Sequence, residues 1–491
     1  MGTIRTQGLQ NTIITYLGIV VGFVSLLVVQ PLYLTPEELG LTRVLISFSL
    51  LVAVFLPLGA TNITIRYFPH FRDESTRHRG YFGFMLLFPM VGFMITALIL
   101  YLLRGFFIKQ YSEESALFAE YFIYVIPFSL ILGMVNVLNS YSFSIFKTSF
   151  PTLLNDVIVK LLFMGVILIY SFGVINLTQF IAFFIGVYFL QAIILLIYIY
   201  VTDRPSLKIN VPFLRKQGVT EIFQYGFLLS IGALASLGLK YLDAIMLAKF
   251  EPLAVVGVYT ICAFIPTVIE APLNSLEKIT MTKLASATAH KKEEEIKTIY
   301  YKSAKYMFLI GGLLFIGINI NIENILEFLR DEYMDGVNVV FIISLGTLAV
   351  MAGGSNAQII FSSAKYKIGV FLLIILLLTA FVSNLIFIPR YGMNGAAIAT
   401  ALSAFIYSGL RVAYLRYRFK YQPFDKNTFY IIVLILACFG INFILPSFTN
   451  NIADILFRST IITIVYVAGT YAFKIIPEFH HHIPGPGRNK R

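Results

Sequence analysis

Long apolar stretches alternate with short polar loops along almost the whole chain. The stretches are near 20 residues each, enough for an α-helix to cross about 30 Å of hydrocarbon. The period-two alternation of a membrane-spanning β-strand is absent from them. We therefore predict about fourteen transmembrane helices, at residues 11–33, 41–60, 81–103, 118–140, 151–172, 177–201, 222–241, 252–275, 303–321, 336–358, 367–388, 394–415, 428–447 and 453–475.

Composition narrows the class to an all-α polytopic membrane protein. Of the 491 residues, 58% are hydrophobic and 13% are charged, whereas a soluble domain has about 25% charged residues. The net charge of +12 does not indicate nucleic-acid binding, because the basic residues lie in short loops between spans. Cys262 and Cys438 lie in separate apolar stretches, so we expect no disulfide framework, no metal site and no cofactor.

The charges of the loops predict the orientation of the chain. Basic residues concentrate in every second loop, and acidic residues such as Glu37 and Glu323 lie in the loops between them. By the positive-inside rule, the basic loops are cytoplasmic. We therefore expect a multi-pass protein of the cytoplasmic (inner) membrane with both termini inside. The basic residues at the end of the twelfth apolar stretch and just after it are counted with the cytoplasmic loops: Arg411, Arg416, Arg418 and Lys420.

The segment 384–400 predicts a tight outer hairpin between two spans. Pro389 lacks an N–H group and is expected to stop the first helix. Gly392 allows the backbone to turn where a side chain would be strained. Gly395 and the alanines that follow start the next helix with little bulk, which favours close packing of helices in a bilayer.

Three segments resemble one family. Residues 389–400 read P-x-Y-G-x-x-G-A-A-x-A-T, residues 57–68 hold Pro57-Leu58-Gly59-Ala60 followed by Arg66-Tyr67-Phe68, and Tyr225-Gly226 follows a basic linker. Their order and spacing resemble the bacterial polysaccharide flippases of the MATE-like exporters of multidrug, oligosaccharidyl-lipid and polysaccharide substrates, over roughly residues 5–420. The resemblance implies two lobes of about six helices around a central cavity, built from structural repeats.

A domain plan follows from the resemblance and the loop composition. We expect an N-lobe at 1–201, a cytoplasmic linker at 202–221, a C-lobe at 222–420, two further spans at 421–477 and a disordered cytoplasmic tail at 478–491. Within the C-lobe, residues 276–302 are predicted to form a helix on the cytoplasmic membrane surface. The segments 36–40 and 251–257 are a faint echo of each other, as expected of repeated halves.

Polar residues inside spans are the candidate site residues, because a polar group in hydrocarbon needs a partner or a wet cavity. Asn11 shares one helix face with Gly18 and Gly22, and Asn136 shares a face with Gly133. These two faces line a cavity or pack against other helices, and the sequence favours neither. The side chains of Lys240 and Asp243 lie three residues apart, so they can pair with each other or bind substrate.

Three further charged residues are candidates. Arg43 lies just inside the outer end of the second span and Arg66 just past its inner end. Both suit phosphate recognition, and Arg66 equally suits a membrane anchor. Glu270 lies between Pro266 and Pro272, which makes it either a coupling-ion group in a broken helix or a carboxylate near the inner interface.

The resemblance implies a flippase for undecaprenyl-pyrophosphate-linked oligosaccharide that works by alternating access in surface polysaccharide biosynthesis. It binds this substrate and membrane lipid, works as a monomer and operates with a polysaccharide polymerase or other assembly proteins. A cation-coupled small-molecule antiporter of the same fold remains the alternative. A membrane enzyme is a third reading, but no catalytic constellation is visible and we predict no enzyme activity.

Overall fold

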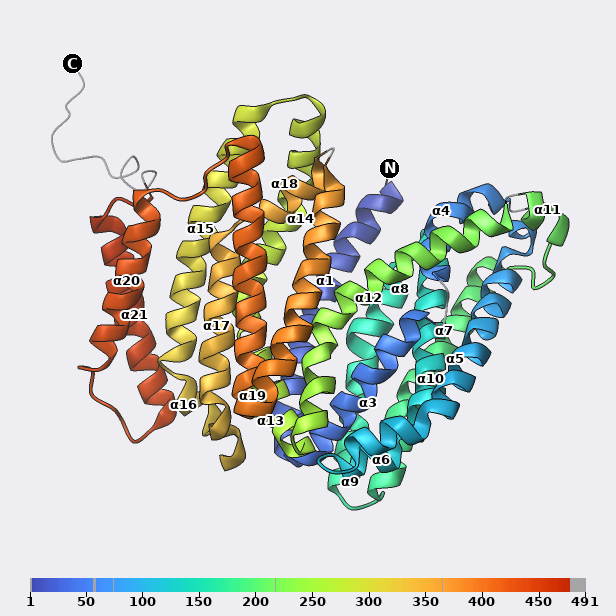
Figure 1. Ribbon diagram of the computed structural model, residues 1–491, viewed down its shortest axis with the longest axis horizontal. Helices are drawn as coiled ribbons and strands as arrows, with labels where there is room; N and C mark the ends of the chain where they lie inside the picture. Colours follow the sequence, from blue (N-terminus) through green and yellow to red (C-terminus); the bar gives the residue numbers. More distant parts are fainter. Residues whose placement is uncertain (1, 56–58, 74, 217, 364, 477–491) are drawn as a thin grey trace. The chain divides into compact units, whose positions relative to one another are not determined.

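The computed structural model describes residues 2–55, 59–73, 75–216, 218–363 and 365–476. Within these residues all regular structure is helical (Figure 1). Nine of the described helices are long and apolar enough to cross a membrane, or ten if one bent pair counts as a single span. The predicted all-α membrane class is confirmed, whereas the predicted count of fourteen spans is not. The predicted tail, 478–491, lies outside the described residues.

Contacts divide the chain into a first unit, residues 1–261, and a second unit, residues 262–491. The predicted linker 202–221 therefore lies within the first unit. The helices of that unit are α1 (Gly2–Val24), α2 (Gln30–Tyr33), α3 (Pro36–Phe55), α4 (Ala60–Phe71), α5 (Tyr81–Tyr111), α6 (Ala116–Tyr121), α7 (Val125–Ser144), α8 (Ser149–Leu153), α9 (Val159–Ser171), α10 (Leu177–Asp203), α11 (Val211–Lys216), α12 (Val219–Phe250) and most of α13 (Leu253–Phe264). It also contains two π-helical turns, η1 (Ser25–Val29) and η4 (Leu154–Ile158), and two 3₁₀ turns, η2 (His78–Gly80) and η3 (Phe122–Tyr124).

Helix α7 lies at the centre of the first unit, where it contacts α3, α4, α5 and α10. At one end of α7 the hydroxyl of buried Tyr141 donates a hydrogen bond of 2.6 Å to Asp203 at the end of α10. The same carboxylate lies 3.0 Å from the ring of buried His78. Phe68 and Tyr81 surround this group with aromatic rings. The polar group is satisfied inside an apolar shell, which fixes the ends of three helices together.

A pair of glycines lets the starts of α3 and α13 touch. A Cβ atom on Gly40 would lie 1.9 Å from the carbonyl oxygen of Leu253, and a Cβ atom on Gly257 would lie 1.9 Å from the carbonyl oxygen of Pro36. Gly40 lies four residues after Pro36, and Gly257 lies four residues after Leu253. Each segment therefore supplies one glycine and one carbonyl group, and the contact is reciprocal. The two segments that echo each other in the sequence therefore meet in the fold.

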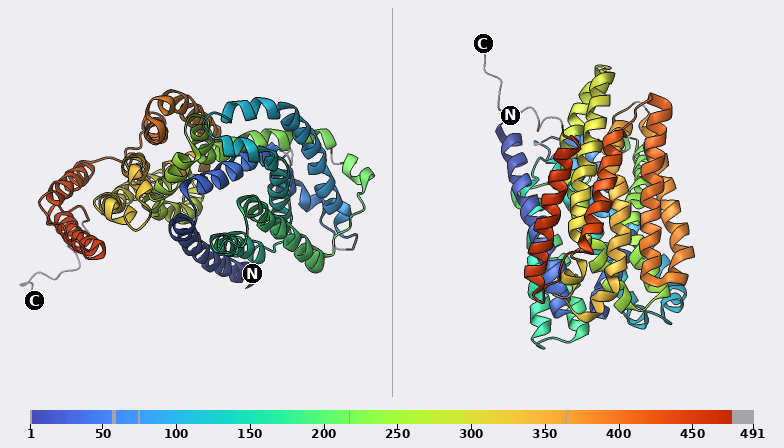
Figure 2. Two further views of the ribbon diagram at one scale, coloured as in Figure 1. Left: turned by 90° about the horizontal axis from the view of Figure 1, so that it is seen from below. Right: turned by 90° about the vertical axis from the view of Figure 1, so that its left-hand side faces the viewer.

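The described part of the second unit contains eight helices besides the end of α13. They are α14 (Thr267–Ala289), α15 (Glu293–Asn319), α16 (Ile322–Leu326), α17 (Val337–Ala352), α18 (Asn356–Ser362), α19 (Tyr366–Phe419), α20 (Lys426–Asn442) and α21 (Asn451–Ala472), with a 3₁₀ turn, η5 (Asp331–Gly336). Residues 276–302, predicted as a surface helix, are shared by the end of α14 and the start of α15. Helices α20 and α21 pack together and against α15 (Figures 1 and 2).

The hairpin predicted at 384–400 is present within α19. The helix passes Pro389 and turns at Gly392, whose φ of 54° and ψ of −131° are not helical. Pro389 therefore does not itself stop the first helix: the helix gives up one backbone hydrogen bond there and ends at the non-helical Gly392. A Cβ atom on Gly395 would lie 2.1 Å from the carbonyl oxygen of Phe387, which confirms the close packing expected of this glycine.

A buried carboxylate fixes the α20–α21 hairpin to α16. Asp454 accepts hydrogen bonds from Arg458 at 2.7 Å, from Asn324 at 2.7 Å and from the backbone N–H of Phe448 at 2.9 Å. Arg458 also donates to Asn442 at 2.7 Å. The carboxylate is almost fully buried and accepts three hydrogen bonds, so it stabilises the end of the hairpin where α20 connects to α21.

We expect Asp454→Asn to lower the melting temperature and to expose the hairpin to protease. Removal of one partner leaves the buried Arg458 charge unpaired, which costs about 3–5 kcal/mol. The measurement is thermal unfolding of the purified protein with limited proteolysis. Asp331→Asn, which changes an exposed carboxylate of η5, is the matched control. Equal melting temperatures for both variants would show that Asp454 contributes no stability.

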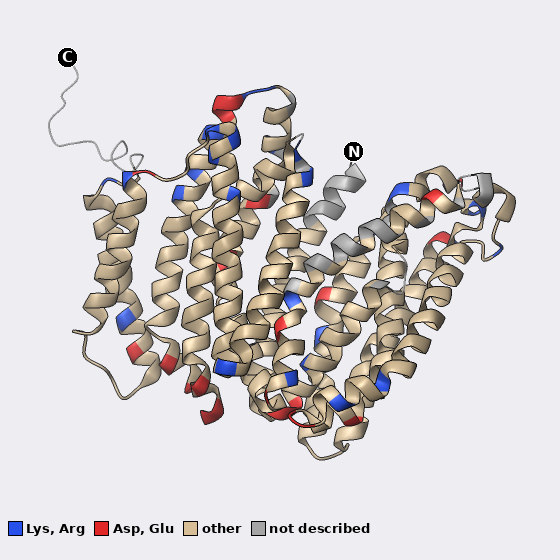
Figure 3. Ribbon diagram, viewed as in Figure 1, with Lys and Arg blue, Asp and Glu red and all other residues tan. Residues whose placement is uncertain are grey.

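Charged residues lie mainly toward the ends of the helices, and only a few lie part-way along them (Figure 3). This distribution is expected of helices that cross hydrocarbon, because a charge there is costly unless it faces a partner or a wet cavity. The few charges that lie part-way along helices are therefore the starting point for the functional site.

Candidate substrate-binding site

Helix α12 is the frame of the candidate site in the first unit. It packs against α3, α4 and α5 and carries the predicted residues Lys240 and Asp243. Tyr225, which belongs to one of the family motifs, lies on the same helix. At 1.5 Å per residue, Tyr225 and Lys240 are separated by roughly 22 Å along the axis. The helix therefore contributes to two separate levels of the first unit, which we call the Lys240 level and the Tyr225 level.

Lys160 is the centre of the Lys240 level. Its ammonium donates a hydrogen bond of 2.8 Å to the carbonyl oxygen of Gly18 on α1, and it interacts electrostatically with Asp156 one turn earlier. A Cβ atom on Gly18 would lie 2.7 Å from the Cβ atom of Asp156, and one on Gly22 would lie 2.8 Å from the ammonium of Lys160. The small residues of α1 therefore pack against η4 and α9, and that packing places the lysine.

Lys240 brings a second positive charge to the same level. It interacts electrostatically with Lys160, and its side chain is exposed. Its ammonium lies 5.3 Å from the centre of the Tyr241 ring. A lysine in mid-helix that faced lipid would be very costly, so the exposed ammonium indicates a water-filled space. Two lysines near one carboxylate give this level a net positive charge.

Arg43 and Asp243 lie nearby on two helices. Arg43 of α3 is half-buried, and Tyr188 of α10 and Tyr241 of α12 are its electrostatic neighbours. Asp243 accepts a hydrogen bond of 2.8 Å from the hydroxyl of Tyr259. Tyr241 is therefore an electrostatic neighbour of Arg43 and a ring neighbour of Lys240, so two of the predicted residues share one neighbour.

The two predicted asparagines occupy different surroundings. Asn11 donates a hydrogen bond of 2.8 Å to Thr148, while its side-chain oxygen is buried without a partner. Asn136 of α7 is exposed, and its carbonyl accepts a bond from Ser140. Asn11 therefore joins α1 to the start of α8, whereas the amide of Asn136 remains accessible.

An amide cluster that the sequence did not indicate lies beside this site. Asn155 in the π-turn η4 accepts hydrogen bonds from Asn139 at 3.4 Å and from Gln191. The side-chain oxygens of Asn139 and Gln191 are buried without a partner. Single π-turns inside helices occur frequently at functional sites. The three amides come from three separate apolar stretches, so no spacing in the sequence connects them.

The Tyr225 level joins two of the family motifs. The guanidinium carbon of Arg66 lies 4.2 Å from the centre of the Tyr225 ring and 5.5 Å from that of Tyr67. Gly59, with φ of +79°, is so close to α12 that a Cβ atom would lie 2.1 Å from the carbonyl oxygen of Gly226. Arg66 is exposed, so its N–H groups remain available to an anion while the rings hold its plane.

The loop after α4 adds a fixed negative charge beyond this level. Asp73 accepts hydrogen bonds from Ser75 and pairs with Arg79 at 3.4 Å. These bonds, the one from the Ser75 side chain above all, lower the pKa of Asp73 to about 2. The carboxylate is therefore ionised throughout the physiological range and offsets part of the positive charge of the loop.

Glu270 lies in the second unit. It is half-buried on α14, which begins directly after Pro266 and continues through Pro272. Its electrostatic neighbour is Arg411 of α19. Arg411 is only 6% exposed, so it is a buried residue and not a member of the cytoplasmic loop to which its sequence position assigns it. Among the described residues, no group of three His, Cys, Asp or Glu side chains is arranged to hold a metal ion.

The fold is that of known flippases and transporters. The inward closed conformation of the lipid II flippase MurJ matches with a TM-score of 0.72 and 13% identity, over 94% of this chain and 98% of MurJ. An inward-facing multidrug resistance MATE transporter matches with a TM-score of 0.62 and 13% identity, over 83% of this chain and 94% of that protein. The protein is therefore a multi-pass membrane protein with the fold of the MOP superfamily.

A family model described as "Polysaccharide biosynthesis protein" matches residues 8–277, more than half of the chain. The chain belongs to this family. It is 24% identical to an uncharacterized membrane protein of Methanocaldococcus jannaschii over 89% of each chain. It is also 24% identical to the capsular polysaccharide biosynthesis protein CapF of Staphylococcus aureus, over 30% of this chain and 38% of CapF.

Proposed function

We propose that the protein is a flippase for a pyrophosphate-linked oligosaccharide on an undecaprenyl carrier. It moves this lipid from the inner to the outer leaflet of the cytoplasmic membrane by alternating access, for surface polysaccharide biosynthesis. The observation that carries the proposal is the pair Lys160 and Lys240 in the first unit, with Arg43 beside Tyr241. A pyrophosphate is an anion that these cations are suited to bind.

Charge also supplies a driving force. A pyrophosphate carries about two negative charges, and its outward movement across a membrane with an inside-negative potential of 100 mV is downhill by roughly 4–5 kcal/mol. The membrane potential therefore favours export of the substrate. The exposed Arg66 at the Tyr225 level provides a first contact for the pyrophosphate, and Asn136 offers an amide to the sugar hydroxyl groups.

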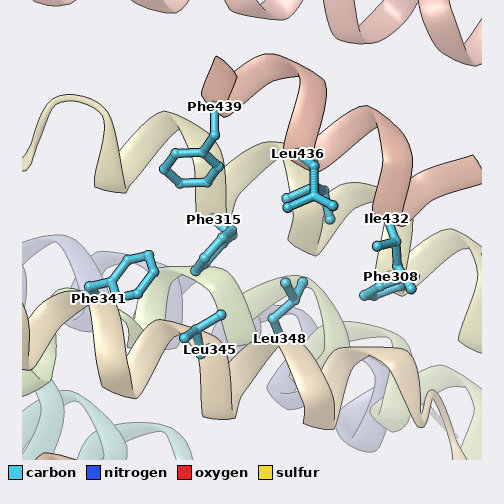
Figure 4. Close-up of a pocket in the computed structure, with 9 residues that line it drawn as sticks. Phe308, Phe315, Phe341, Leu345, Leu348, Ile432, Leu436 and Phe439 are labelled. Atoms are coloured by element: carbon cyan, nitrogen blue, oxygen red, sulfur yellow. The ribbon is translucent and has the colours of Figure 1, made fainter. Parts of the chain in front are cut away.

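An apolar cavity in the second unit supports the lipid part of the proposal. It has a volume of about 300 Å³ and lies between α15, α17 and α20. Figure 4 shows that Phe308, Phe315, Phe341, Leu436 and Phe439 point into it, and every lining residue is apolar. An isoprenoid tail has the chemistry to occupy such a cavity, because it buries apolar surface without leaving polar groups unpaired.

The test is the accessibility of the glycan lipid on intact cells that lack the protein, with and without its restoration. We expect glycan lipid to accumulate inside when the protein is absent and to return to the outer face on complementation. The readout is labelling of outward-facing glycan by an impermeant reagent. Unchanged labelling in the absence of the protein would overturn the proposed function.

A cation-coupled antiporter of small molecules is the second candidate. It is favoured by the half-buried Glu270 and by the fold that the chain shares with the MATE transporter. Increased drug sensitivity of the deletion strain, with unchanged glycan labelling, would favour it. For either function we propose a monomer with both termini in the cytoplasm. A flippase would supply a polysaccharide polymerase or other assembly proteins on the outer face.

A further inference from the structure

Among the described residues of the second unit, one buried arginine has no direct ion pair. Arg411 is 6% exposed, and its Nε atom has no hydrogen-bond partner. Its guanidinium carbon lies 3.9 Å from the centre of the Tyr407 ring. No ion pair within 4.0 Å joins Arg411 to a carboxylate among the described residues. A buried cation in this situation indicates a site whose occupant completes its surroundings.

Two carboxylates face this arginine from α14. Glu270 and Glu277 both interact electrostatically with Arg411 and with each other. They lie seven residues apart, two helical turns, so they share one face of the helix. Both are half-buried. The hydroxyl groups of Tyr300 on α15 and Tyr407 on α19 are the other titratable groups that interact with Arg411.

Polar contacts from α18 complete the cluster. The side-chain amide of Gln358 is a polar neighbour of Glu277, while the Gln358 side-chain oxygen is buried without a partner. The hydroxyl of Tyr300 is likewise buried without a partner. Helices α14, α15, α18 and α19 therefore all contribute to one group of charges inside the second unit.

The charges of this cluster do not balance. Two carboxylates and one guanidinium leave one negative charge, and a half-buried charge without a compensating cation is costly inside a bundle of apolar helices. We propose that the Glu270–Glu277–Arg411 cluster is a binding site for one proton. The proton comes from the solution and forms an O–H bond on one carboxyl group. The other carboxylate keeps its charge and compensates Arg411.

A proton suits the cluster better than a metal cation. A hard cation needs a shell of several oxygen ligands, and the guanidinium occupies one side of this group. No third Asp, Glu, His or Cys joins the two glutamates to form a metal-binding group within the described part of the chain. The use of the proton in transport rests on the proposed function, but its binding does not.

Infrared spectroscopy of the purified protein in lipid tests the proposal. We expect a carbonyl band from one protonated carboxyl group per chain at neutral pH, assigned by subtraction of variant spectra from that of the parent protein. Glu270→Gln and Glu277→Gln should each remove this band completely, because the remaining carboxylate then balances Arg411 and needs no proton. Glu323→Gln, at an exposed position on α16, should leave it unchanged.

Substitution of the arginine separates charge from packing. Arg411→Gln should increase the band about twofold, because both glutamates then take up a proton. Arg411→Lys keeps the charge and should keep the original band, and it replaces the glutamine variant as the test if that variant does not fold. A band that halves in each glutamate variant would indicate two independent protons and overturn the proposal. A band that survives both substitutions, or that addition of Na⁺ abolishes at fixed pH, would do the same.

The experiment also distinguishes this proposal from the proposed function. The band is measured without substrate, so its presence and its loss in the variants stand whatever the protein transports. If the band behaves as expected but glycan labelling does not depend on the protein, only the flippase function fails. If labelling depends on the protein but no variant changes the band, only the proton site fails.

Discussion

Gly40→Ala and Gly257→Ala are each expected to destabilise the protein strongly. The new Cβ atom would lie 1.9 Å from a backbone carbonyl oxygen in either variant, so the starts of α3 and α13 must separate. Overpacking of this kind costs about 1–3 kcal/mol, and more where a backbone atom is the obstacle. The measurement is the melting temperature of the purified protein, which should fall by several degrees.

The chain offers a matched control for these variants. Gly186 lies within α10, and a Cβ atom there would meet nothing within 4 Å. Gly186→Ala should therefore maintain or raise the melting temperature, because alanine favours a helix by about 0.5–1 kcal/mol over glycine. A melting temperature of the Gly40 variant equal to that of the parent protein would contradict the close contact.

The double variant tests whether the two glycines act at one contact. Once Gly40→Ala has separated α3 from α13, the second Cβ atom meets less obstruction. The combined loss should therefore be smaller than the sum of the two single losses, as expected for residues that share a contact. Additive losses would indicate two independent sites.

Local chemistry made part of the fold predictable. The turn at Gly392 and the close packing of Gly395 depend on residues within a few positions of each other, so the sequence indicated both. The apolar stretches likewise predicted an all-α membrane protein. The exact course of α19 past Pro389 was missed, because the helix gives up the hydrogen bond that proline removes and continues as far as Gly392.

The two polar clusters could not be predicted to the same extent. Arg411 has the sequence context of a cytoplasmic positive charge, and only the approach of α14, α15 and α18 reveals its burial. Asn139, Asn155 and Gln191 are likewise far apart in the chain, with separations of 16 and 36 residues between successive members. Glu270 was indicated because an unusual proline pair surrounds it, whereas Glu277 falls in a polar segment that looked like a surface helix. The role of such charges and amides depends on neighbours that tertiary packing brings together, so the sequence alone does not reveal it.

Lys240→Gln is expected to lower the export of glycan lipid by about 10- to 100-fold, because a hydrogen bond to a charged group contributes about 1.5–3 kcal/mol. The substitution should leave the amount of folded protein unchanged, since the side chain is exposed. Lys240→Arg should retain most of the activity, because a cation in that place can still bind pyrophosphate. Outward-facing glycan, labelled on intact cells, is the readout.

Controls on the same helices decide between charge and position. Lys249→Gln changes a lysine near the C-terminal end of α12 and should leave export close to that of the parent protein. Lys160→Gln alone leaves Asp156 without its cation and should reduce both folding and export. In Lys160→Gln with Asp156→Asn the local charges balance again, so folded protein should return while export stays low. Export restored along with folding would mean that Lys160 only supports the packing of α1 against α9, and Lys240 would then bind the pyrophosphate without it.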